Sequence, residues 1–170
     1  HKMDQYKIES KLYMKPGKGK QLLKMILNMI LVGSVLLTLF QMLMDGFSIT
    51  RIGELCIIVL VVSYYNKQIE PGYRFSLLDI EIDSEKVRFV YHTVTIGTRT
   101  EDIQYEVLAN QIHQIEYDKQ RNTITVTGNL RKTMDGKEEM EKELVVYFNK
   151  EADQVLSSLE NRLGCNVIVS

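Results

Sequence analysis

The chain has 170 residues, of which 45% are hydrophobic and 25% charged, and its net charge is −1. This composition is typical of a globular protein and excludes collagen, low-complexity disorder and a disulfide-rich scaffold. A mean hydropathy of −0.12 would also favour a soluble protein. However, residues 1–24 carry a net charge of +5, residues 25–72 one of −1 and residues 73–170 one of −5. The chain therefore consists of three segments of different character.

The first segment, residues 1–24, is expected to be a basic cytoplasmic arm, because seven Lys outnumber two acidic residues there. Alternation between Tyr6 and Met14 predicts a short strand, which Pro16–Gly17 is expected to end. Lysines beside a membrane attract anionic lipids by about 1 kcal/mol each. The lysines of this segment that lie nearest the apolar run could either contact anionic lipid or only fix the membrane topology. These lysines are Lys15, Lys18, Lys20 and Lys24.

Two apolar runs in residues 25–65 predict a transmembrane helical hairpin. Residues 25–44 contain no charged side chain, and as a helix they would be about 30 Å long, the thickness of the hydrocarbon core. Asp45–Gly46 predicts a turn, and residues 47–65 form the second run. A buried hairpin in a soluble protein is the alternative, but the 98 residues after Gly72 could hardly cover both helices on all sides.

Most basic residues near the hairpin lie before the first apolar run or after the second, and few lie near the turn between them. Seven Lys precede the first run, Lys67 and Arg74 follow the second, and only Arg51 lies near the turn. The positive-inside rule therefore predicts a two-span protein of the cell membrane with both termini in the cytoplasm. Residues 66–72 would be a linker, and residues 73–170 a cytosolic domain. The two Cys, which form no CxxC motif, agree with a reducing compartment.

Small and polar residues recur at helical spacing in both apolar runs. Such residues let helices approach closely in lipid and form interhelical hydrogen bonds. These residues could serve either to pack the two helices of the hairpin together or to dock a membrane partner or a second copy of the chain. The candidate packing face consists of Ser34, Thr38 and Gln41 in the first run and Gly53, Cys56 and Ser63 in the second.

Alternation of apolar and polar residues dominates residues 73–148 and predicts about seven antiparallel strands joined by tight turns. Residues 149–164 then follow the period of an amphipathic helix, with Asn149 as its N-cap and Gly164 as its C-terminal stop. A short strand is expected at residues 166–169. The fold class is therefore α+β: a transmembrane helical hairpin followed by an antiparallel β-barrel with a C-terminal capping α-helix.

This arrangement resembles the bacterial PH-like domain proteins, in particular the YcxB-like group, in which two N-terminal membrane spans precede such a domain. The resemblance is carried by residues 73–92, 101–126 and 142–164. It implies a PH-like barrel and no fixed active site. Eukaryotic relatives of the fold often bind phosphoinositides through a basic turn. The corresponding turn here, Asp83–Lys86, is mostly acidic, so we do not expect that activity.

The sequence contains no metal-ligand spacing, nucleophile elbow or phosphate-binding loop, so we expect neither an enzyme nor a cofactor. The acidic domain lacks Trp and basic-aromatic interleaving, so we expect no nucleic-acid partner. Three carboxylates occupy alternate positions of one predicted strand and therefore lie on one face of it. They could form an ordinary solvated sheet face or an acidic docking face for a basic partner. These carboxylates belong to Asp79, Glu81 and Asp83.

The sequence thus favours a non-enzymatic, membrane-anchored PH-like module that docks or regulates a protein partner or membrane complex, or that self-assembles. Its expected partners are the lipid bilayer and either another protein or a second copy of the chain. One alternative is a ligand-gated two-span membrane effector, for example one that senses cyclic oligonucleotides. The other alternative is a membrane scaffold that binds anionic lipid through the lysines before the first span.

Overall fold

The computed structural model describes residues 3–15 and 17–170 of the chain. They form a sheet unit, whose described residues are 3–13 and 73–170, and a helical unit within residues 14–72. The elements in chain order are β1 (Asp4–Met14), α1 (Lys18–Asp45), α2 (Ile49–Ile69), β2 (Gly72–Ile82), β3 (Lys86–Ile96), β4 (Arg99–Leu108), the 3-10 helix η1 (Ala109–Gln111), β5 (Ile112–Asp118), β6 (Thr123–Met134), β7 (Lys137–Tyr147), α3 (Asp153–Leu163) and β8 (Val167–Val169).

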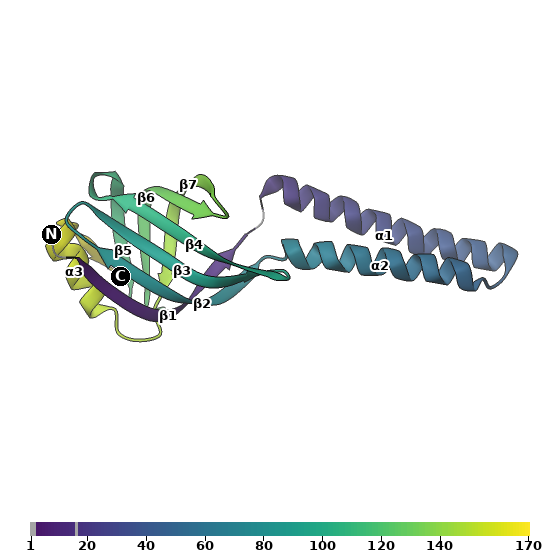
Figure 1. The fold of residues 1–170 in the computed structure, drawn as a ribbon, viewed down its shortest axis with the longest axis horizontal. Coiled ribbons are helices and arrows are strands. Elements are labelled where there is room, and N and C mark those ends of the chain that lie inside the picture. Colours follow the sequence, from purple (N-terminus) through teal and green to yellow (C-terminus); the bar gives the residue numbers. More distant parts are fainter. Residues whose placement is uncertain (1–2, 16) are drawn as a thin grey trace. The chain divides into compact units, whose positions relative to one another are not determined.

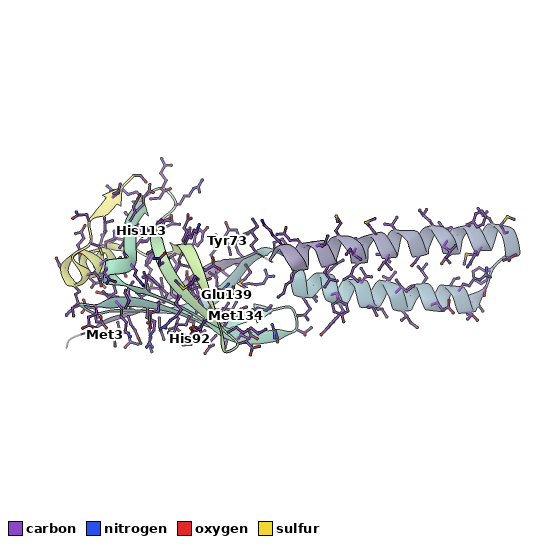
Figure 2. All side chains as sticks on the ribbon, turned by 90° about the horizontal axis from the view of Figure 1, so that it is seen from above. Met3, Tyr73, His92, His113, Met134 and Glu139 are labelled. Carbon is purple, nitrogen blue, oxygen red and sulfur yellow. The ribbon has the colours of Figure 1, made fainter. Side chains whose placement is uncertain are left out.

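The helical unit consists of α1 and α2, and both helices are long and apolar enough to cross a membrane. The prediction of two long apolar helices near the start of the chain is therefore confirmed. Helix α1 begins at Lys18, earlier than the apolar run at Met25, because Lys, Gln and Leu are good helix formers. Side chains project from both helices along their whole length (Figure 2).

The sheet unit is built on one curled, mostly antiparallel sheet followed by a C-terminal helix, as expected (Figure 1). Its strand order is β1-β2-β3-β4-β6-β5-β8, and β7 pairs with β6. The parallel pair is β5 with β8, where the chain returns after α3. Helix α3 runs beside the first half of β1, and Gly164 ends it as expected, in a left-handed conformation.

The core of the sheet unit is built from the inward-facing residues of each strand and one side of α3. In β2 the even-numbered Leu78, Ile80 and Ile82 are fully buried, while the odd-numbered residues point to the other face. Side chains in a strand alternate between faces, so this parity fixes which residues enter the core and which lie on the outer face. Helix α3 contributes Val155 and Leu159 to the core.

The predicted helix N-cap at Asn149 is wrong, because α3 is capped at Ala152. The side-chain amide of Asn122 donates hydrogen bonds to the carbonyl oxygens of Phe148, at 3.1 Å, and Lys150, at 2.7 Å. These bonds hold residues 148–150 as a loop. Local preference for Asn at an N-cap is therefore overridden by a contact from a distant turn.

Strand β1 corrects the expected boundary between a basic arm of residues 1–24 and a separate domain. Its residues belong to the sheet unit, where β1 pairs with β2. Ser10 and Leu12 are 7% and 4% exposed, which makes them part of the core. The predicted strand before the spans is thus confirmed, but its predicted break at Pro16 lies outside the described residues. The helical unit is an insertion between two neighbouring strands of one sheet.

Candidate functional site

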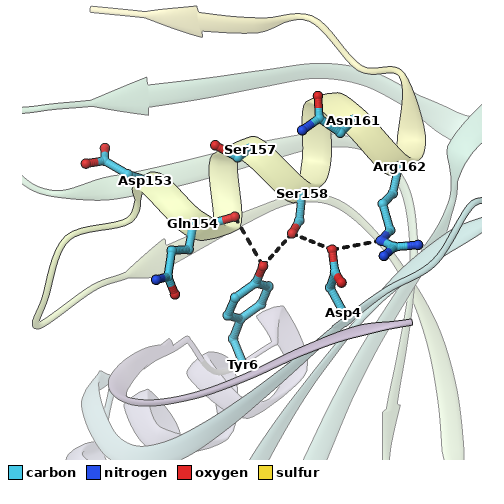
Figure 3. Close-up of a pocket in the computed structure, with 8 residues that line it drawn as sticks. All are labelled: Asp4, Tyr6, Asp153, Gln154, Ser157, Ser158, Asn161 and Arg162. Carbon is cyan, nitrogen blue, oxygen red and sulfur yellow. Dashed lines mark hydrogen bonds and ion pairs between the residues drawn. The ribbon is translucent and has the colours of Figure 1, made fainter. Parts of the chain in front are cut away.

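A polar cluster joins the start of β1 to α3 (Figure 3). The Asp4 carboxylate accepts hydrogen bonds from Ser158 Oγ at 2.7 Å and Arg162 Nε at 2.8 Å. Tyr6 Oη lies 2.5 Å from Ser158 Oγ and 3.3 Å from the carbonyl oxygen of Gln154. We call these five residues the β1–α3 clasp.

The electrostatics of the β1–α3 clasp favour a structural role. Hydrogen bonds from Arg162 and Ser158 lower the pKa of Asp4, and Asp4 in turn raises the pKa of Arg162. A lowered pKa makes a carboxylate a weaker base, whereas a general base is usually tuned upward. The open pocket of about 540 Å³ beside the clasp is lined by these groups and by further polar side chains of α3.

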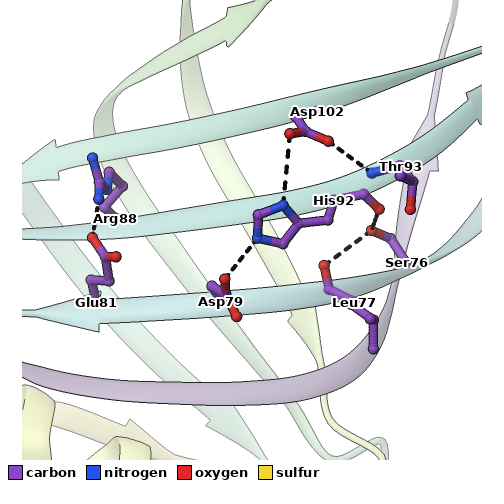
Figure 4. A network of polar contacts seen from close by, with 8 residues as sticks. All are labelled: Ser76, Leu77, Asp79, Glu81, Arg88, His92, Thr93 and Asp102. Atoms are coloured by element: carbon purple, nitrogen blue, oxygen red, sulfur yellow. Dashed lines mark hydrogen bonds and ion pairs between the residues drawn. The ribbon is translucent and has the colours of Figure 1, made fainter.

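The three predicted docking carboxylates each have a partner within the sheet unit, and Figure 4 shows the partners of Asp79 and Glu81. Asp79 Oδ2 lies 2.7 Å from His92 Nε2, and Glu81 pairs with Arg88, the residue opposite it on β3. Asp83 caps its own turn by accepting the backbone N–H of Glu85 at 2.7 Å and of Lys86 at 2.8 Å. These contacts leave less uncompensated charge for a basic partner, and the acidic docking face stays a prediction.

The contact around His92 accompanies an irregularity of β3 that the alternation pattern did not reveal. Pairing of β3 with β4 shifts register between Tyr91 and Val94, and Thr93 adopts a φ of 49°. Asp102 Oδ1 accepts the Thr93 N–H at 2.9 Å, and its Oδ2 lies 3.7 Å from His92 Nδ1. In the described part of the chain, no three His, Cys, Asp or Glu side chains are grouped to hold a metal ion.

The predicted packing face of the helices is not one surface in the structure, because its residues in α1 and in α2 lie on different sides of the hairpin. Asn66 Nδ2 donates to Asn28 Oδ1 across the hairpin at 3.0 Å, which marks the inner side of α1. Ser34, Thr38 and Gln41 are half-buried, as Asn28 is, so they lie on that inner side, and Thr38 Oγ1 donates to the Ser34 carbonyl at 2.8 Å.

The candidates of α2 lie on its outer side instead. Val62, the inward residue of this helix, is 3% exposed. The three predicted residues are all exposed: Gly53, Cys56 and Ser63. A Cβ atom added at Gly53 would meet no atom within 4 Å, so nothing in the hairpin uses the space that this glycine leaves.

The four candidate lysines lie at the start of the helical unit. Lys15 precedes α1, and the other three belong to its first turns. Lys15, Lys18 and Lys20 are exposed, while Lys24 is half-buried. Their contact with anionic lipid stays a prediction.

Sequence reasoning missed an aromatic cluster formed by β1, β2 and β7. The ring centroid of Tyr73 lies 5.1 Å from that of Tyr13 and 5.6 Å from that of Tyr147. Lys11 Nζ lies 4.6 Å from the Tyr73 centroid and 4.8 Å from that of Tyr147, within the range of a cation–π interaction. Tyr73 Oη is 3.3 Å from Tyr147 Oη, a contact that raises the pKa of Tyr147 to about 12.

A signal for this cluster is present in β2. Once the even-numbered Leu78 and Ile80 are placed in the core, Tyr73, Phe75 and Leu77 must point outward. Three successive outward apolar residues are unusual on a strand with one solvated face. Phe75 is 82% exposed and Leu77 59% exposed.

Comparisons with protein families, curated proteins and solved structures return no match to this chain.

Proposed function

We propose that the chain is a non-enzymatic, two-span membrane protein whose sheet unit is a PH-like binding module. It docks or regulates a protein partner, or it binds a second copy of itself. The observation that carries this proposal is the insertion of the hairpin between β1 and β2. Any force or restraint on either helix reaches a strand of the same sheet through only a few residues.

The fold of the sheet unit supports a PH-like module in its main features. A curled antiparallel sheet precedes a C-terminal helix whose apolar side enters the core. Two features depart from the simplest version of that fold. Strand β1 precedes the hairpin, and β8 adds a short parallel strand after α3.

The charge distribution supports placement in the cell membrane with both chain ends in the cytoplasm. Lys18 and Lys20 begin α1, and Lys67 lies in the last turn of α2. Basic residues at both of these helix ends favour the cytoplasmic side. The Asp45–Gly46 turn would then face the outside.

Binding within the membrane is supported by the outer side of α2. Gly53, Cys56 and Ser63 are exposed there, and small residues let a second helix approach closely. Because the partner helix α1 uses the other side, this row is free to contact another membrane protein or another copy.

Site-specific photocrosslinking of the full chain in its native membrane tests the proposal. A benzophenone amino acid at Cys56 is expected to capture a second copy or one defined membrane protein. The matched control carries the same amino acid at Val61, also exposed, about 140° around the helix at 100° per residue. Val61 should react with lipid.

Two results together would contradict the proposal. The first is reaction with lipid alone from both Cys56 and Val61. The second is a detergent-purified chain that stays monomeric and brings no protein with it from the membrane.

A further inference from the structure

An exposed apolar surface covers the outer side of β1 and β2 in the sheet unit. Its members are Tyr13, Tyr73, Phe75 and Leu77, which are 49%, 47%, 82% and 59% exposed. On β2 they are consecutive odd-numbered residues, and Tyr13 joins them through its ring contact with Tyr73. We call these four residues the outer aromatic face. Contiguous apolar surface of this kind marks a contact site rather than an ordinary solvated strand.

The covalent chain limits how far the outer aromatic face can move from the two helices. Tyr13 lies five residues before Lys18, and Tyr73 lies four residues after Ile69. At about 3.6 Å per extended residue, these connections span at most about 18 Å and about 14 Å. The polar layer on each side of a bilayer is itself roughly 5–8 Å thick. If the helices cross a bilayer, this face stays within reach of its surface.

The chemistry of the outer aromatic face suits a phospholipid surface. Tyrosine has an apolar ring and a polar end, and it is enriched where hydrocarbon meets headgroups. Lys11 places a positive charge over the rings of Tyr73 and Tyr147. Lys7 lies on the same exposed side of β1, and Lys15 is exposed just beyond the strand. Aromatic rings with lysines around them complement the acyl and phosphate layers of an anionic membrane.

We propose that the outer aromatic face binds the headgroup layer of the phospholipid bilayer that holds the hairpin. The sheet unit would then present its remaining surfaces, including α3 and the exposed Met140 of β7, to the cytoplasm. This inference rests on the proposed function, because it requires that α1 and α2 span the membrane. It goes further by assigning a bilayer-contact surface to the sheet unit itself.

A single-tryptophan reporter tests the inference, because the chain contains no Trp. The Phe75→Trp variant of the full chain is reconstituted in liposomes of phosphatidylcholine and phosphatidylglycerol, with ordinary or brominated acyl chains. Its fluorescence should shift to the blue, resist aqueous acrylamide and be lost in brominated lipid. Leu77→Trp provides a second reporter on the same face.

The matched control is Met140→Trp on β7, where the native side chain is 65% exposed. Its fluorescence should stay red-shifted, be quenched by acrylamide and be unchanged by brominated lipid. Replacing phosphatidylglycerol with phosphatidylcholine should reduce the bromine quenching of the Phe75→Trp reporter, because the lysines then lose their anionic partners.

The outcomes separate this inference from the proposed function. In one outcome the protein floats with the liposomes, but the fluorescence of Phe75→Trp behaves like that of Met140→Trp. This result would overturn the bilayer contact of the outer aromatic face and leave the membrane anchor intact. A Phe75→Trp reporter that is shielded from acrylamide but insensitive to bromine would show that protein covers the face, which also overturns the inference. A chain that does not float with liposomes would overturn both.

Discussion

Single residues hold the two ends of the sheet unit together. Asp4 accepts hydrogen bonds from two side chains of α3, and Ser158, which supplies one of them, is 5% exposed. Hydrogen bonds to a charged group are stronger than those between neutral groups. The ionisation of one carboxylate therefore contributes to the attachment of β1.

Substituting Asp4→Asn should remove an acid-sensitive part of the stability. The pKa of Asp4 is lowered in the folded state, so its contribution is complete above its ordinary value of 3.8 and is lost as the pH falls through the lowered pKa. The free energy of unfolding of wild type and variant should therefore differ at neutral pH and converge in strong acid. Urea unfolding of the full chain in detergent measures this, with exposed Glu160→Gln as control. A difference that does not change with pH would contradict the prediction.

Gly128 is the residue whose size the fold restricts most directly. A Cβ atom there would lie 2.2 Å from the carbonyl oxygen of Gln111, at the irregular pairing of β5 with β6. Gly128→Ala should therefore destabilise the sheet unit by about 1–3 kcal/mol, the usual cost of overpacking. Thermal unfolding followed by circular dichroism measures it. Gly19→Ala, where a Cβ atom meets nothing within 4 Å, is the control and should not destabilise the chain, because Ala is the better helix former.

At the scale of elements, α3 stabilises the sheet unit by closing its core. Leu159 is fully buried, and it shares one side of the helix with Ala152 and Val155. Leu159→Ala should cost about 2–5 kcal/mol, through lost burial and the cavity left behind. Hydrogen exchange of the full chain should then show faster opening of α3 and of β1, which the clasp joins to it. Exposed Glu160→Ala is the control, and equal exchange in both variants would argue against this coupling.

Most elements could be predicted because their signal is local. Alternation around Leu78–Ile82 or Val87–Tyr91 and the apolar spacing of Val155 and Leu159 identify strands and helix without knowledge of their neighbours. Helix boundaries were less predictable, since Asn149 looks like a cap until Asn122 from a distant turn binds its neighbours.

The candidate site was harder to predict than the fold. The aromatic cluster brings Tyr13, Tyr73 and Tyr147 together from three strands, and Tyr13 and Tyr73 are separated in sequence by the whole hairpin. The pairs of Asp79 with His92 and of Glu81 with Arg88 depend on the register of β2 against β3. Alternation alone does not specify that register. Such contacts become visible only when the strands are assembled.

For the whole molecule, the decisive feature is that the sheet unit is discontinuous in sequence. The expected domain of residues 73–170 lacks β1, and therefore lacks Ser10 and Leu12 from the core. A fragment that begins at Tyr73 leaves this part of the core and α3 uncovered. Sequence alone did not reveal this, because β1 and its partner β2 are separated by more than fifty residues.

A matched pair of deletions tests this arrangement. Joining residues 3–14 to residues 72–170 through a short Gly-rich loop should yield a soluble, cooperatively folded sheet unit. Residues 73–170 alone should aggregate or unfold at lower temperature, because an uncovered sheet edge and core are exposed. Sedimentation and thermal melting compare the two proteins. Equal solubility and stability would contradict the role assigned to β1.

The β1–α3 clasp also has a consequence for how the protein is made. Asp4 and Arg162 are 158 residues apart, so at 5–20 residues per second the ribosome takes roughly 8–30 s to supply the second residue after the first. Throughout that time β1 lacks the α3 side of the clasp, whereas the hairpin and β2, its neighbour in the sheet, are synthesised well before α3. The clasp therefore forms only after α3 has been synthesised, and nascent chains stalled before α3 should leave the start of β1 accessible to proteases.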